Sequence, residues 1–177
     1  KRGPGLRREA MPTVLAGFPD GHRLVAGDGP LRVALEDQAR RLGIADRVEF
    51  LGRYRNEELP GILQRADVAV LPFLVAAGGD QEGLGLVTVE AMGCGLPVVV
   101  GDVPAVYDVV AHERTGLIAK TSDSTALAKQ IMRLLTDPAL ATRLAAAGRE
   151  HALTRFDWRF AAVTFGAVVV YLTFTFV

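Results

Sequence analysis

Two glutamates, eight positions apart, flank a glycine-rich turn near the middle of the chain. Glu82 precedes Gly83 and Gly85, and Glu90 lies in the apolar helical pattern that follows. Glycine lets a backbone approach a ligand closely, and the N–H groups and dipole of a helix N-terminus favour phosphate. A carboxylate accepts hydrogen bonds from a vicinal diol without transferring a proton. The spacing therefore predicts an anion site built mainly from backbone, with a hydroxyl-binding acid on each side.

The same spacing argues against the acid pair of a glycoside hydrolase. Inside one helix the two glutamates would lie roughly 12 Å apart along the axis and about 80° apart around it. The acids of a glycoside hydrolase lie about 5 to 9.5 Å apart around one bond. The sequence also has no His/Cys or Asp-rich spacing typical of zinc or calcium sites, so we expect neither a metal nor a cofactor.

These residues need an α/β fold to position them. Short apolar or β-branched runs alternate with longer helical patterns, which is typical of βαβ units and a Rossmann-like parallel sheet. Strands are expected at residues 22–26, 47–51, 68–71, 97–100 and 116–119. Because most of these runs are apolar throughout, helices should cover both faces of the sheet. The glycine-rich turn follows the third strand, at the edge where parallel α/β sheets bind ligands.

Helices are expected between the strands and after the last one. The glycine-rich turn should open a helix over residues 84–92, which Gly93 and Gly95 end. Pro138 should start the last long helix. The other helices are expected at residues 6–15, 31–42, 56–66 and after a cap within residues 122–124.

The composition fits one globular domain. The chain has 177 residues, half of them apolar, and 20 basic residues balance 20 acidic ones. Zero net charge gives no bulk attraction for nucleic acid, so recognition of phosphate must be local. The single cysteine, Cys94, cannot form an intramolecular disulfide, which favours a reducing, cytoplasmic compartment. The chain starts at Lys1 without a methionine, and we expect it to be a fragment of a longer protein.

Several motifs resemble, in the same order, the C-terminal domain of family-4 retaining glycosyltransferases, which have the GT-B fold. The segment from Glu82 to Glu90 resembles the E-x7-E motif of that family. The other matching segments are residues 24–30, 48–52, 66–72, 115–118, 148–149 and 156–158. E-x7-E alone is a weak signal, whereas the ordered set is specific and extends from Arg2 to about Trp158.

The resemblance implies a donor site for a nucleotide-diphosphate sugar. Glu82 would contact the donor sugar and be the catalytic residue of the motif, and Glu90 would bind the ribose. The amides of Gly83, Leu84 and Gly85 would bind the diphosphate and the sugar.

Two more contacts are implied by the same resemblance. Arg2 stands where the family usually has a lysine that neutralises the diphosphate, so the charge is kept while the geometry changes. The base would lie near residues 52–55. One turn departs from the family, because Ala105 replaces the glutamate of a common Gly-Gly-x-Pro-Glu turn. The loss of that contact allows reduced activity or a changed donor.

The implied function is donor binding in a retaining glycosyltransferase. Residues 1–160 would form the nucleotide-sugar-binding domain. An N-terminal domain outside this chain would hold a sugar or lipid-linked acceptor, so the fragment alone should be inactive. Two alternatives stay open: another GT-B enzyme, such as a sugar-nucleotide epimerase, and a non-catalytic nucleotide-binding module.

Residues 161–177 form an apolar tail. Every residue in this run is apolar, glycine, threonine or tyrosine, and its length is just short of a membrane span. The tail fits a buried or interface helix, a membrane segment or non-native sequence, and its Val, Thr and Phe content suits a strand as well. If exposed, it predicts aggregation or peripheral contact with a membrane.

Overall fold

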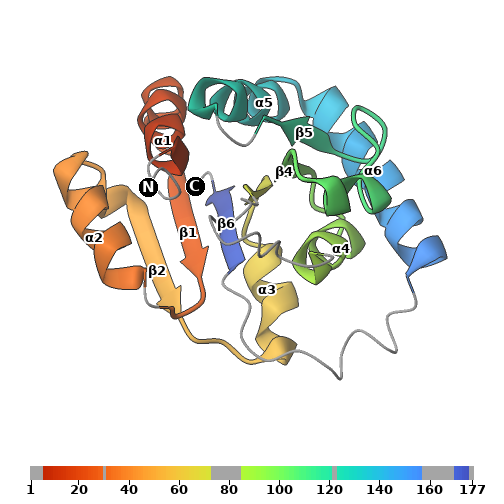
Figure 1. Cartoon of the computed structure of the whole chain (residues 1–177), viewed down its shortest axis with the longest axis horizontal. Coiled ribbons are helices and arrows are strands. Elements are labelled where there is room, and N and C mark those ends of the chain that lie inside the picture. Colours follow the sequence, from red (N-terminus) through yellow and green to blue (C-terminus); the bar gives the residue numbers. More distant parts are fainter. Residues whose placement is uncertain (1–5, 30, 73–84, 121–122, 157–169, 176–177) are drawn as a thin grey trace.

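Helices lie on both sides of the strands in the computed structural model, which describes residues 6–29, 31–72, 85–120, 123–156 and 170–175 (Figure 1). The strands are β1 (His22–Ala26), β2 (Val48–Gly52), β3 (Ala69–Leu71), β4 (Val98–Gly101), β5 (Leu117–Ala119) and β6 (Val170–Thr175). The α-helices are α1 (Leu6–Gly17), α2 (Arg32–Arg41), α3 (Leu59–Leu63), α4 (Leu86–Gly93), α5 (Ser124–Thr136) and α6 (Pro138–Arg155). Three short 3-10 turns are η1 (Ala45–Arg47), η2 (Asn56–Glu58) and η3 (Pro104–Asp108).

The five expected strands form, and each pairs in parallel with at least one other strand of its own sheet. One sheet contains β1 and β2, and a second sheet has the order β3-β4-β5. Leu71 pairs with Val100, and Gly101 pairs with Ala119, so β3, β4 and β5 end at one edge. The predicted Rossmann-like α/β fold with parallel strands flanked by helices is confirmed.

A sixth strand, from the apolar tail, adds one antiparallel pairing to the five parallel strands expected from the sequence. β6 runs antiparallel to β1, with Ala26 opposite Val170, and it also lies against β3 (Figure 1). Its residues have high strand propensity, and they pair with backbone N–H and C=O groups along β1 that would otherwise need partners. Residues 161–169 and 176–177 of the tail lie outside the described part of the chain.

Apolar side chains fill both faces of the strands, as the uninterrupted apolar runs predict. In β4, Val98 and Val100 belong to one buried cluster and Val99 belongs to the other. The first cluster includes side chains from α3 and α4, and the second includes side chains from α1 and α5. Because successive side chains of a strand point to opposite faces, each central strand joins the two clusters.

The helix limits differ from expectation at two places. The helix expected at residues 56–66 divides into η2 and α3, because Pro60 has no N–H to donate to the preceding turn. The helix expected from residue 84 begins at Leu86, with Gly85 as its N-cap. The later helices follow the prediction: the Asp123 carboxylate caps α5, and Pro138 lies in the first turn of α6.

Among the helices that the structure describes, none combines the length and the apolar character needed to cross a bilayer.

Candidate functional site: the carboxyl edge of the strands

Two glycines with positive φ shape the edge where β1 and β2 end. Gly27 has a φ of 112° and Gly52 a φ of 70°, a backbone region that favours glycine. The Gly27 N–H donates to the Gly52 carbonyl at 2.9 Å. A Cβ atom on Gly52 would lie 3.0 Å from Nη1 of Arg32, at the start of α2. The two strand ends are therefore tied together, and the backbone is compact at this edge.

The N-terminus of α4 presents backbone donors at the same edge. The Gly85 carbonyl accepts from the amides of Thr88 at 2.6 Å and of Val89 at 3.4 Å. The amides of Leu86 and Val87 precede these, so they have no acceptor inside the helix, and they lie at the positive end of the helix dipole. This turn has the geometry that an anion site requires.

Of the predicted site residues, Gly85 and Glu90 lie in the described part of the chain, and both belong to α4 or its cap. Arg2, Glu82, Gly83 and Leu84 lie outside the described residues. The roles of all six residues stay predictions.

Glu90 is a half-buried carboxylate on an otherwise apolar helix. Its neighbours Val89 and Ala91 are buried, and burial raises the pKa of Glu90 above its ordinary value. In the part of the chain that the structure describes, no ion pair or hydrogen bond is recorded for this carboxylate. A partly desolvated carboxylate of this kind is available to accept hydrogen bonds from a ligand.

Tyr54 joins this site from the end of β2. It packs against the hydrophobic cluster that includes α4, and burial, reinforced by the negative charge of Glu90, raises the pKa of Tyr54 to about 12. The structure thus brings residue 54, from the segment expected to hold the base, close to Glu90. Tyr54 was not among the residues predicted from the sequence, where its signal is an aromatic residue two positions after Gly52.

The C-terminal end of α4 packs against α6. Burial and the charge of Glu90 raise the pKa of the Cys94 thiol, and Arg149 of α6 acts in the opposite direction. A Cβ atom on Gly95, which has a φ of 77°, would lie 3.8 Å from Nη1 of Arg149. Cys94 is half-buried and packs against the core, in keeping with a structural role.

Two further observations concern polar groups near this site. The Thr88 hydroxyl is buried, and no hydrogen-bond partner is recorded for it in the described structure. Within the described residues, no group of three or more His, Cys, Asp or Glu side chains lies close enough to hold a metal ion. The expectation that neither metal nor cofactor takes part stays a prediction.

Comparison with known families identifies the class of protein. The family described as "Glycosyl transferases group 1" matches residues 2–151. The chain belongs to this family of glycosyltransferases, and its fold is that of the C-terminal domain of a GT-B protein.

Individual relatives share the same region. The chain is 35% identical over 161 residues to a Corynebacterium glutamicum protein named GDP-mannose-dependent monoacylated alpha-(1-6)-phosphatidylinositol monomannoside mannosyltransferase, covering 89% of this chain and 41% of the relative. It is 33% identical to the structure of sucrose-phosphate synthase from Thermosynechococcus elongatus, with a TM-score of 0.74, covering 92% and 41% of the two chains.

A further solved structure was determined with a nucleotide sugar. Anabaena HepE in complex with UDP-glucose is 25% identical to this chain with a TM-score of 0.75, covering 91% of this chain and 43% of HepE. The chain therefore spans about two fifths of the length of these relatives.

Proposed function

We propose that this chain is the donor-binding domain of a retaining glycosyltransferase and that residues 1–160 bind a nucleotide-diphosphate sugar. The observation that carries the proposal is Glu90, a half-buried carboxylate that has no recorded partner among the described residues, on a helix whose first-turn amides lie at the carboxyl edge of the strands. A partly desolvated acid and first-turn amides that have no acceptor inside their own short helix match the two polar parts of a nucleotide diphosphate, the ribose diol and the phosphates.

The proposed roles follow the position of each group. The α4 amides, with Gly85 as the cap, bind the diphosphate, and Glu90 accepts hydrogen bonds from the ribose hydroxyls. Tyr54, beside Glu90, lies next to the base. Glu82 contacts the sugar, and Arg2 supplies a cation to the diphosphate. The C. glutamicum relative is named for GDP-mannose, and HepE was solved with UDP-glucose, which supports a sugar nucleotide as the ligand class.

The proposed mechanism is electrostatic. In a retaining transfer the bond from the anomeric carbon to the phosphate oxygen breaks, and the acceptor hydroxyl oxygen bonds to that carbon from the face that the leaving phosphate occupies. The hydroxyl proton passes to the leaving phosphate oxygen. Negative charge develops on the diphosphate, and the dipole and amides of α4 are already oriented to stabilise it. The acceptor, a sugar or a lipid-linked acceptor, is held by an N-terminal domain outside this chain, so transfer requires the longer protein.

Calorimetric titration of this chain with GDP, GDP-mannose, UDP and UDP-glucose tests the proposal. We expect at least one nucleotide diphosphate to bind, and Glu90→Ala to weaken it by about 10- to 100-fold, the range for a lost hydrogen bond to a charged group. Glu150→Ala, which removes an exposed carboxylate from α6, is the matched control and should leave affinity unchanged.

A second variant separates the sugar from the nucleotide. Glu82→Ala should weaken the sugar nucleotides more than the bare nucleotides, because Glu82 is proposed to contact the sugar alone. Failure of the wild-type chain to bind any member of the panel would contradict the donor-binding proposal. Binding by the longer protein without any sugar transfer would favour the non-catalytic module instead.

A further inference from the structure

The turn after β4, where the sequence departs from its family, carries an acid at a different position. The Asp102 N–H donates to the Ala119 carbonyl at 2.8 Å, which ties the turn to the end of β5. The 3-10 turn η3 follows directly and contains Ala105, half-buried, where the family commonly has glutamate. The acid that directly follows β4 is therefore Asp102, three residues before Ala105.

A tyrosine holds this carboxylate in place. The Tyr107 hydroxyl donates to Oδ1 of Asp102 at 2.9 Å. The hydrogen bond to Asp102 raises the pKa of Tyr107 above its ordinary value. Tyr107 is 60% exposed and Asp102 is exposed as well. Within the described residues no other polar side-chain contact is recorded for Asp102, so its second oxygen has no partner among them.

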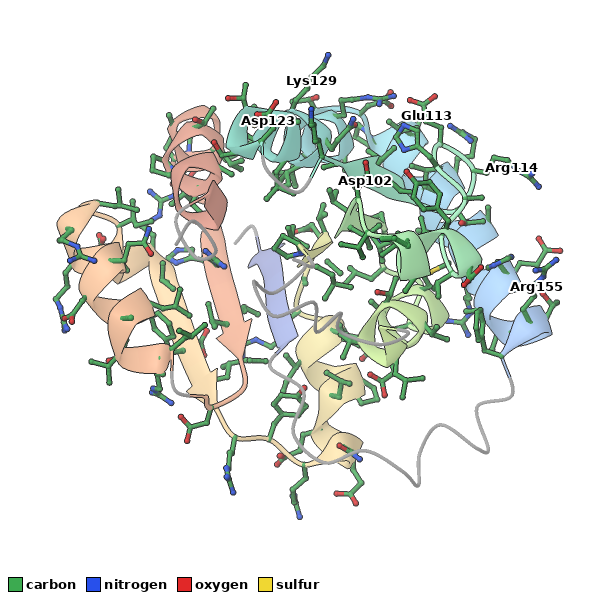
Figure 2. The ribbon with its side chains drawn as sticks, viewed as in Figure 1. Asp102, Glu113, Arg114, Asp123, Lys129 and Arg155 are labelled. Carbon is green, nitrogen blue, oxygen red and sulfur yellow. The ribbon has the colours of Figure 1, made fainter. Side chains whose placement is uncertain are left out.

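The pair lies at the ligand-binding edge of the sheet. Leu71 on β3 pairs with Val100 on β4, so the two strands end together, roughly 4.8 Å apart. β3 leads into the segment that contains Glu82 and Gly85, and β4 leads directly into Asp102. Asp102, labelled in Figure 2, lies on the side of the molecule away from α2. The acid thus follows the strand next to the one that leads to the proposed donor site.

A carboxylate beside an exposed aromatic ring has the chemistry of a sugar contact. The carboxylate accepts hydrogen bonds from hydroxyl groups, and the ring offers an apolar face with a polar tip. We propose that Asp102, oriented by Tyr107, binds a hydroxyl group of a sugar at the rim of the donor site. This inference rests on the proposed function and assigns a specificity contact to the turn that lacks the family glutamate.

The experiment compares three variants that keep the size of each side chain. Asp102→Asn removes the charge but keeps an oxygen for Tyr107, Tyr107→Phe removes the anchoring hydroxyl but keeps the ring, and Asp108→Asn is the control. Asp108 is an exposed acid on the same η3 turn. Thermal unfolding of each variant first establishes that the fold is retained.

Two calorimetric arms identify the source of the sugar. In the first arm, sugar nucleotides and bare nucleotides are titrated into each variant; in the second, free glucose or mannose is titrated into chain saturated with nucleotide diphosphate. We expect Asp102→Asn to weaken binding about 10-fold in one arm, either for the sugar nucleotide or for the free sugar, and to leave the affinity for bare nucleotides unchanged. Tyr107→Phe should weaken the same binding less, and Asp108→Asn should not change it.

The outcomes distinguish this inference from the proposed function. A loss in the first arm assigns Asp102 to the transferred sugar, and a loss in the second assigns it to an acceptor sugar. If the affinities in both arms stay unchanged while Asp102→Asn and Tyr107→Phe only lower the melting temperature, the hydrogen bond only stabilises the turn and the inference is wrong. If the wild-type chain binds neither nucleotides nor sugar nucleotides, the proposed function fails first, and this inference fails with it.

Discussion

The half-buried carboxylate of Glu90 should lower the stability of the unliganded protein. Its carboxylate is partly desolvated, and no compensating partner is recorded for it among the described residues. Burying a charge without a partner costs free energy, so Glu90 lowers the free energy of unfolding of the unliganded protein. A ligand that donates hydrogen bonds to the carboxylate would offset this cost.

Replacing the charge should therefore stabilise the unliganded protein. Glu90→Gln keeps the size and removes the charge, and we expect its melting temperature at about pH 7.5 to rise by about 2 °C, since 1 kcal/mol corresponds to about 2–4 °C in a chain of this size. Glu150→Gln, on the exposed face of α6, should show no such rise.

The pH dependence gives an independent check. Burial raises the folded-state pKa of Glu90 above 4.5, so the folded protein binds more protons than the unfolded chain between the two values. The stability linked to Glu90 is fully present below pH 4.5 and is lost as the pH rises through the folded-state pKa. The advantage of Glu90→Gln in denaturant unfolding should accordingly shrink toward pH 4.5, and an advantage independent of pH would contradict this account.

Replacing either of two glycines with alanine should change the stability of the protein, in opposite directions for the two positions. A Cβ atom on Gly148 of α6 would lie 2.8 Å from the Thr115 carbonyl oxygen, a backbone atom that cannot move aside easily. A Cβ atom on Gly61 of α3 would meet nothing within 4 Å. We expect Gly148→Ala to destabilise by about 1–3 kcal/mol and Gly61→Ala to stabilise by about 0.5–1 kcal/mol, both measured by denaturant unfolding. Equal effects would show that Gly148 is not tightly packed.

β6 is the element that adds most to the arrangement expected from the sequence. It pairs with β1 and lies against β3, so it stands where the β1–β2 sheet and the β3–β5 sheet meet. Without β6, the backbone groups on that side of β1 would form an open strand edge, which favours self-association.

Truncation tests this role directly. A chain ending at residue 169 lacks β6, whereas a chain ending at Thr175 retains it and serves as the control. Loss of the β1–β6 hydrogen bonds, at about 1 kcal/mol each, should lower stability by roughly 3–5 kcal/mol. Thermal unfolding and light scattering should show a lower melting temperature and self-association for the shorter chain alone. An unchanged melting temperature with a monomeric product would show that β6 does not stabilise the sheet.

The whole molecule is organised around strands that belong to both hydrophobic clusters. Val98 and Val100 of β4 face one cluster, and Val99 faces the other, and all three are fully buried. Because the same strand supports both clusters, loss of packing on one face disturbs the backbone that positions the other. The domain should therefore unfold as one cooperative unit.

Calorimetry on two core variants checks this cooperativity. Leu63 and Leu144 are both completely buried, the first in the cluster with α3 and α4 and the second in the cluster with α1 and α5. Leu63→Ala and Leu144→Ala should each destabilise by about 2–5 kcal/mol and shift the same single transition, with equal calorimetric and van't Hoff enthalpies. Two separate transitions, each sensitive to one variant, would show that the clusters unfold independently.

The sequence alone determined the α/β class, the five parallel strands and the family, because these depend on local patterns. An apolar run such as Val98 to Val100 is buried on both faces wherever it lies in the sheet, and the glycine-rich turn before α4 is contiguous in the chain. Helix limits were less predictable, because the division of the third helix depends on the single missing N–H of Pro60.

Only the tertiary structure decided which distant residues meet. The proximity of Tyr54 to Glu90 and the pairing of β6 with β1 leave no periodic signal in the chain. Each depends on where two elements end in space, and that position is set by the packing of the whole core. Strand pairing across a long connection, as between β1 and β6, is chosen by which backbone edge is open once the other elements have assembled.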